Sequence, residues 1–127
     1  MIVGLGVDMV DIARVEALVA RHGERAVTKL FSAGEAAYAR ARPQPGRHLA
    51  SRFAAKEAAF KALAGNDLAR TIGWRDVEVL VERDGQPALR FHGAAARRAA
   101  ELGVRRAFVS LTHSDASAAS VVVLEGE

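Results

Sequence analysis

The sequence predicts an α+β fold: a small single domain, residues 1–127, in which a mostly antiparallel sheet packs on a long helix. Two observations lead to this class. Apolar, β-branched runs typical of strands occur near both ends and in the middle, and alanine-rich segments with helical spacing lie between them. At 127 residues, half of them apolar, the chain is long enough for one core and too short for two.

The opening segment, Met1–Val10, is apolar and β-branched, and it is expected to form a buried strand. Gly4 and Gly6 indicate that another backbone comes close to this strand. Asp8 interrupts the apolar run, so a charged group in this strand needs an explanation. Asp11 can cap a following amphipathic helix. The apolar positions of that helix are Ile12, Val15, Leu18 and Val19.

The middle of the chain predicts two helices separated by a loop. Ser32 and Glu35 have the spacing of a capping box, which opens a short helix that runs to Arg40. Residues 43–46 hold two prolines and a glycine and are expected to form the loop. Residues 48–64 contain no proline or glycine and predict the long helix.

The second half of the chain predicts four strands and one helix. The segment from Gly65 to Gly73 is expected to be a loop, and the turn-forming residues 84–87 join two strands as a hairpin. The predicted strands are Val77–Val81, Ala88–His92, Ala107–Thr112 and Ala118–Leu124, and the predicted helix is Ala94–Leu102, ended by Gly103.

Composition excludes several classes of protein and site. The chain has no cysteine, so it can form neither disulfides nor thiolate metal sites, and it has no thiol nucleophile. No apolar stretch approaches the roughly 20 residues of a membrane helix. We therefore expect a cytoplasmic protein without a membrane partner. Lysine and arginine exceed aspartate and glutamate by 18 to 15, a modest excess that suits an anionic ligand or an acidic partner.

Two acidic residues are candidate metal ligands. Asp8 lies in an apolar strand and Glu57 in an alanine-rich helix, and buried carboxylates are costly unless they are paired or bind a metal. Mg²⁺ commonly takes one or two carboxylates and fills its remaining positions with water and substrate phosphates. The alternative is that Asp8 caps a turn and that Glu57 only pairs with Lys61 at the helical i,i+4 spacing.

Basic residues on the same helix are candidates for binding a phosphate. Arg52, Lys56 and Lys61 share the long helix, and His113 directly follows a strand, where an imidazole can reach a phosphate or transfer a proton. The alternative is a solvated helix face and a structural histidine.

The order of these segments resembles the acyl carrier protein synthase group of the 4′-phosphopantetheinyl transferases across nearly the whole chain. The matching blocks are Gly4-Leu5-Gly6-Val7-Asp8-Met9-Val10 with Arg14, Phe31 with Glu35 and Tyr38, Arg52-Phe53-Ala54-Ala55-Lys56-Glu57-Ala58 with Lys61, and Val109-Ser110-Leu111-Thr112-His113.

The resemblance implies an enzyme that moves the 4′-phosphopantetheine arm of coenzyme A onto a serine of an acyl carrier protein. It implies that Asp8 and Glu57 bind Mg²⁺, and that Glu57, or a water near it, is the base. Lys61, Arg52 and His113 would surround the coenzyme A phosphates, with Lys61 and His113 also serving catalysis. The basic stripe of Arg14, Arg21 and Arg25 would face the acidic helix of the carrier. Members of the group resemble homotrimers with active sites at subunit boundaries.

The chain departs from the family pattern in two loops. Ala64-Gly65-Asn66 stands where Gly-Thr-Gly is frequent, and Gln86 replaces a lysine in the hairpin turn. Three alternatives remain open: a transferase for polyketide or peptide carriers, a non-catalytic assembly protein, and a basic nucleic-acid-binding module. The chain has few aromatic residues and no base-reading motif, which argues against the nucleic-acid-binding module. No nucleic-acid partner is therefore expected.

Overall fold

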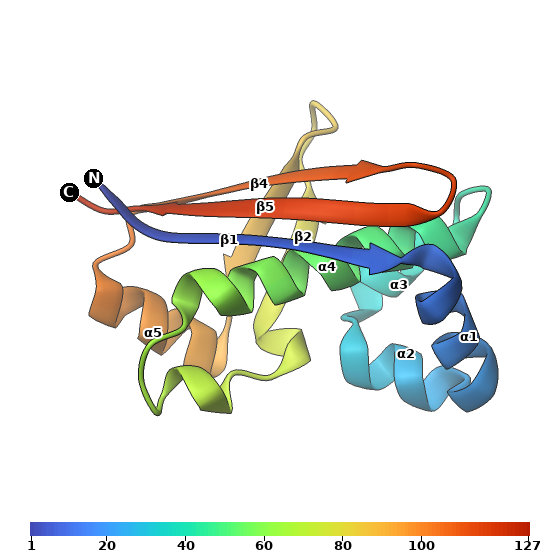
Figure 1. Ribbon diagram of the computed structural model, residues 1–127, viewed down its shortest axis with the longest axis horizontal. Helices are drawn as coiled ribbons and strands as arrows, with labels where there is room; N and C mark the ends of the chain where they lie inside the picture. The colour runs from blue at the N-terminus through green and yellow to red at the C-terminus, as the bar shows by residue number, and fades with distance from the viewer.

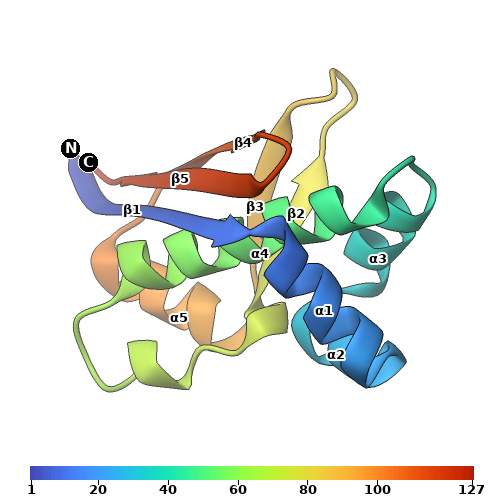
Figure 2. The same ribbon diagram turned by 45° about the vertical axis from the view of Figure 1, so that its right-hand side comes forward.

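The computed structural model describes residues 1–127 and consists of a sheet lying across a long helix (Figure 1). The sheet has three antiparallel strands in the order β1 (Ile2–Asp11), β5 (Ser117–Glu125) and β4 (Arg106–His113). Helix α4 (Pro45–Leu63) runs along one face of this sheet (Figures 1 and 2). The predicted α+β class, with its antiparallel sheet on a long helix, is confirmed.

The remaining helices lie toward the two ends of α4, and the hairpin of β2 (Val77–Val81) and β3 (Pro87–Phe91) packs near its middle, where Lys56 bonds to Val77 (Figure 1). A second, two-stranded antiparallel sheet pairs β2 with β3, as the predicted hairpin requires. None of the helices is both long and apolar enough to cross a membrane. The other elements are α1 (Ile12–His22), α2 (Glu24–Leu30), α3 (Ala33–Arg40), the 3₁₀ turns η1 (Ala69–Thr71) and η2 (Trp74–Asp76), and α5 (Gly93–Leu102).

Three local predictions were wrong or incomplete. Helix α2 was not predicted. Helix α4 begins at Pro45 instead of His48, because the fixed φ of proline and its missing N–H suit the first helical position. Asp11 occupies the cap position of α1, but its side chain makes no capping hydrogen bond. The capping box of α3 is present in full: the Ser32 N–H donates to Glu35, and the Glu35 N–H donates to Ser32.

Strand β1 lies directly on the backbone of α4 because two of its inward positions are glycines. A Cβ atom at Gly4 would collide with the carbonyl oxygen of Ala62, and one at Gly6 with that of Ala58. The helix presents small, fully or almost fully buried alanines to the strand at these places. The close approach of two backbones, predicted from the glycines, is therefore confirmed.

A buried ion pair fixes α3 and β2 against α4. Glu35 and Lys56 have no exposed side-chain surface, and the Lys56 Nζ lies 2.9 Å from Glu35 Oε1. Lys56 also donates to the carbonyl oxygens of Trp74 (2.8 Å) and Val77 (2.5 Å), while the Val79 N–H donates to the other oxygen of Glu35. Burial lowers the pKa of Lys56, and the charge of Glu35 opposes that shift. The charges are thus paired and hydrogen-bonded, as their burial requires.

The outer face of the sheet is apolar and uncovered. No helix lies over this face in either view (Figures 1 and 2). Strand β1 is therefore buried on one face only, contrary to the prediction of a buried strand. The large exposed apolar side chains of this face are Leu5, Val7, Met9, Phe108 and Val121.

The contact at Gly6 predicts a large effect of one methyl group. Gly6→Ala should destabilise the protein by about 1–3 kcal/mol, because the new Cβ must push β1 away from α4. Gly34→Ala, in helix α3, is the matched control: its Cβ meets nothing closer than 3.7 Å, and it should be neutral or stabilising. Urea unfolding of both variants measures the difference. Equal stability of the two variants would contradict the proposed role of the glycine.

Candidate functional site

Asp8, Glu57 and Lys61 form the first group of predicted site residues. Asp8 projects from β1 toward α4, on the same face as Gly4 and Gly6, and its side chain is 15% exposed. The Lys61 Nζ lies 2.9 Å from Asp8 Oδ1 and 3.0 Å from the carbonyl oxygen of Val7. Lys61 thus pairs with Asp8 across two elements, and the i,i+4 pair of Lys61 with Glu57 is not formed.

Glu57 is the member of this group whose pKa is shifted from its ordinary value. Burial raises the pKa of Glu57, and the nearby carboxylate of Asp8 raises it further, while Lys61 and Arg14 oppose the shift. Two carboxylates held close enough to raise a pKa in this way suit a bound cation. Their oxygens fit Mg²⁺, which accepts one or two carboxylates and completes its coordination with other oxygens. No third acidic residue or histidine joins them, so water and a ligand would have to supply the remaining oxygens.

A second group of side chains, the cationic group, is centred on Arg52 on another side of α4. Arg52 is 3% exposed, yet its Nε has no hydrogen-bond partner. Its side chain lines a hollow of about 160 Å³ together with residues from α3, α4, β4 and the β2–β3 hairpin. The lining residues include Tyr38, His48, Arg52, Pro87, Leu111 and His113.

Basic side chains gather in and around the hollow. Burial lowers the pKa of His48, and the neighbouring basic residues Arg52, Arg42, His113 and Arg47 lower it further. Burial also lowers the pKa of Arg52, although arginine stays charged in proteins. A buried guanidinium with an unused N–H is a ready donor to an anion, and phosphate is a strong acceptor for arginine.

The structure does not bring the two groups together in one chain. Arg52 and Glu57 share α4, but five residues turn a helix by about 500°, which leaves their side chains roughly 140° apart. The charges that act on Glu57 are Asp8, Lys61 and Arg14, and none of them belongs to the Arg52 group. Within one chain, the predicted site residues therefore form a carboxylate group (Asp8, Glu57 and Lys61) and a cationic group (Arg52 and His113, joined by His48, which was not predicted).

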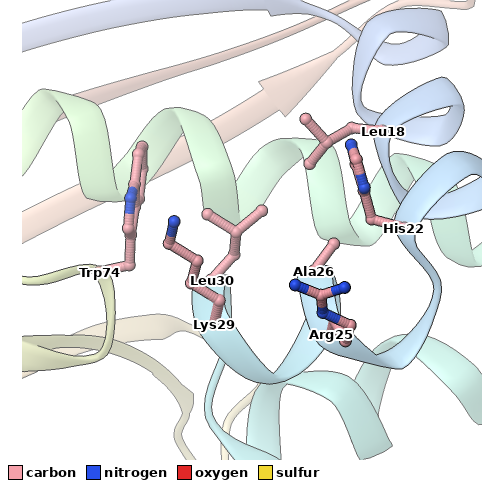
Figure 3. A pocket seen from close by; sticks show the side chains of 7 residues that line it. All are labelled: Leu18, His22, Arg25, Ala26, Lys29, Leu30 and Trp74. Atoms are coloured by element: carbon pink, nitrogen blue, oxygen red, sulfur yellow. The ribbon is translucent and has the colours of Figure 1, made fainter.

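The predicted partner-binding arginines lie on α1 and α2. Arg14, Arg21 and Arg25 are all exposed. Arg14 lies close enough to Glu57 to affect its pKa, so the basic face adjoins the carboxylate group. Arg25 lines a hollow of about 380 Å³ whose other walls are apolar or basic (Figure 3). Its residues are Leu18, His22, Arg25, Ala26, Lys29, Leu30 and Trp74.

Comparison with known proteins decides the family. The model of the 4′-phosphopantetheinyl transferase superfamily matches residues 4–121. This chain belongs to that superfamily. It is 48% identical over 128 residues to the holo-[acyl-carrier-protein] synthase of Cutibacterium acnes, with 99% of this chain and 100% of the relative covered.

Solved structures agree with this assignment to the 4′-phosphopantetheinyl transferases. The acyl carrier protein synthase of Mycobacterium tuberculosis is 36% identical over the whole of both chains, with a TM-score of 0.76. A coenzyme A complex of the acyl carrier protein synthase of Chronobacterium ammoniagenes is 28% identical, covers 98% of this chain and 97% of that one, and has a TM-score of 0.83. The family membership that the sequence blocks indicate is confirmed.

Sequence reasoning missed His48, a member of the cationic group, and Arg42, which lies beside that group. His48 stands one helical turn before Arg52, at the i,i+4 spacing that places both on one face, so the pattern held a usable signal. Arg42 follows helix α3 and reaches the group only through the fold, so no local sequence pattern indicates its place there.

The raised pKa of Glu57 predicts a gain in stability when its charge is removed. The folded protein binds this proton more tightly than the unfolded chain, so ionised Glu57 weakens the fold at neutral pH, and the penalty disappears as the pH falls through the raised pKa. Glu57→Gln should therefore melt at a higher temperature than the wild type at pH 7 in EDTA. The gap should shrink toward pH 4.

Thermal unfolding across this pH range measures the effect. The exposed Glu82 of the β2–β3 turn supplies the control, since Glu82→Gln should leave the melting temperature unchanged. A Glu57→Gln variant that melts below the wild type at pH 7 would contradict the electrostatic account.

Proposed function

We propose that this protein transfers the 4′-phosphopantetheine group of coenzyme A to a serine of apo acyl carrier protein, for fatty acid biosynthesis. The other product is adenosine 3′,5′-bisphosphate. The observation that carries the proposal is the carboxylate pair of Asp8 and Glu57 beside Lys61, in a chain of the 4′-phosphopantetheinyl transferase superfamily. The names of the relatives support the same reaction. The cytoplasmic location expected from the sequence stays a prediction.

Asp8 and Glu57 are the residues that would hold Mg²⁺, and the ion would supply positive charge to the diphosphate of coenzyme A. Lys61 is more than half exposed and bonded only to acceptors of β1, so its ammonium can turn to a phosphate oxygen of the leaving group. Its charge then stabilises the bisphosphate as the bond to phosphopantetheine breaks.

The carrier serine must lose its proton as it attacks phosphorus. Glu57, or a water held near it, is the candidate base for that proton, because its carboxylate lies beside Asp8 where the serine must attack. The attacking serine must then approach from the side of α1, where Arg14 adjoins Glu57.

The cationic group suits the phosphate that does not react. Coenzyme A carries a diphosphate, at which the bond breaks, and a separate phosphomonoester on the ribose. Since Arg52, His48 and His113 lie apart from the carboxylate group, we assign the phosphomonoester to them. An ester with up to two negative charges matches a buried guanidinium with a free N–H.

We also propose a homotrimer with active sites at its subunit boundaries. The uncovered face of Leu5, Val7, Met9, Phe108 and Val121 is a contiguous apolar surface on a β-sheet, which a second copy of the chain can cover. A boundary also lets the carboxylate group of one subunit meet the cationic group of the next. One coenzyme A molecule then spans the two groups that a single chain keeps apart.

The decisive experiment is the intact mass of apo acyl carrier protein incubated with this protein, coenzyme A and Mg²⁺. A gain of one phosphopantetheine, lost with EDTA and with Asp8→Ala or Glu57→Ala, is the expected result. Transfer that persists in folded Asp8→Ala or Glu57→Ala would overturn the metal assignment. No transfer to fatty acid, polyketide or peptide carriers would overturn the function itself.

Mixed trimers test the shared site. Glu57→Ala and Arg52→Ala each inactivate or weaken their own homotrimer, but they damage different groups. When the two variants are unfolded together in equal amounts and refolded as mixed trimers, activity should return. About one boundary in four then combines an intact carboxylate group with an intact cationic group. Each variant refolded alone is the control. A mixture no more active than its parents would place both groups of a site in one subunit.

Charge reversal on α1 tests the carrier-binding face. Arg21 is chosen over Arg14 because Arg14 also acts on Glu57. Arg21→Glu should raise the KM for the carrier about tenfold at low salt, and the difference should narrow in 0.5 M NaCl as ions screen the charges. Arg97→Glu, an exposed arginine of α5, is the matched control and should leave this KM unchanged. Equal KM values for the two variants would exclude α1 as the docking face.

A further inference from the structure

Tyr38 stands between two arginines at the cationic group. The guanidinium carbon of Arg42 lies 3.3 Å from the centroid of the Tyr38 ring, and that of Arg52 lies 4.1 Å from it. The His48 ring meets Tyr38 edge-on, with 5.7 Å between centroids. Arg42 also donates to the Tyr38 carbonyl oxygen at 2.8 Å. The ring is thus held by Arg42 and His48 while it packs against Arg52.

Few other contacts fix the direction of the Arg52 side chain. It forms no ion pair, and its hydrogen bond from Nη1 to the His48 carbonyl oxygen is long, at 3.3 Å. The carboxylate that acts on it, Glu35, is paired with Lys56. An arginine side chain loses considerable rotamer freedom when it is ordered. An aromatic face that already holds the guanidinium reduces the side-chain entropy that is lost when the ligand binds.

We propose that Tyr38 is a positioning residue that holds the guanidinium of Arg52 toward the phosphomonoester of coenzyme A. The inference rests on the proposed function. It gives a role to a residue that the sequence blocks singled out and that the transfer reaction itself does not use. Tyr38 offers the face of its ring to Arg52, and its hydroxyl also acts on that guanidinium. Phenylalanine keeps the ring and should therefore retain most of the effect. It does not touch the reacting atoms, so its effect should fall on coenzyme binding alone.

The test compares Tyr38→Leu, which removes the aromatic ring, with Tyr38→Phe, which keeps it. Calorimetry in EDTA measures binding of adenosine 3′,5′-bisphosphate, so neither metal nor turnover is involved. Tyr38→Leu should bind about tenfold more weakly than the wild type, and Tyr38→Phe within about twofold of it. Adenosine 5′-monophosphate, which lacks the 3′-phosphate, should bind both variants and the wild type alike. In transfer assays, Tyr38→Leu should raise the KM for coenzyme A and leave kcat unchanged.

Phe91→Leu is the matched control, because Phe91 is another half-buried aromatic residue and lies at the far end of the hairpin from the hollow. If Tyr38→Leu does not fold, Tyr38→Met replaces it as an unbranched side chain without a ring. Three results would overturn the proposal: unchanged bisphosphate binding in the ringless variant, equal losses in the leucine and phenylalanine variants, or an equal loss in Phe91→Leu. A wild type that binds bisphosphate but transfers nothing to any carrier would refute the proposed function, and the calorimetry would still decide the role of Tyr38.

Discussion

The contact of β1 with α4 at Gly4 and Gly6 is the constraint on which the rest of the structure depends. Because neither glycine has a side chain, the strand rests on the helix backbone, and the sheet it belongs to is held at a fixed height above α4. Asp8 follows two residues after Gly6 on the same face, so this contact also sets how far its carboxylate lies from Glu57 and Lys61. The geometry of the carboxylate group is therefore a result of core packing between two rigid elements.

Most of the fold could be predicted from the sequence because its local signals agree with the final structure. The Ser32–Glu35 capping box, Gly103 at the end of α5 and the apolar strands each carry enough local information. Helix α2 was missed because its seven residues are too few to show a clear period, and it is stabilised by tertiary contacts, including those with η2. Pro45 was assigned to a loop although the same residue is favoured at a helix start.

For the candidate site, resemblance to a family gave the residues but not their grouping. Asp8, Glu57, Arg52 and His113 were named as one site, whereas the chain separates them on two sides of α4. Helix phase alone could have indicated the division between Arg52 and Glu57. The pairing of Lys61 with Asp8 instead of Glu57 could not have been predicted, because it depends on how closely β1 approaches the helix.

The order of strands in the sheet has a consequence for synthesis on the ribosome. The central strand, β5, follows every other element in the chain, while its neighbour β1 comes first, and the two pair along almost their whole length (Figure 1). Until β5 has left the exit tunnel, β1 and β4 have no partner and their backbone groups stay unpaired. A nascent chain can form its helices early, but Asp8 reaches its final position only when the last strand is inserted. The emerging polypeptide cannot assemble its carboxylate group before this step, which depends on long-range strand pairing that forms slowly.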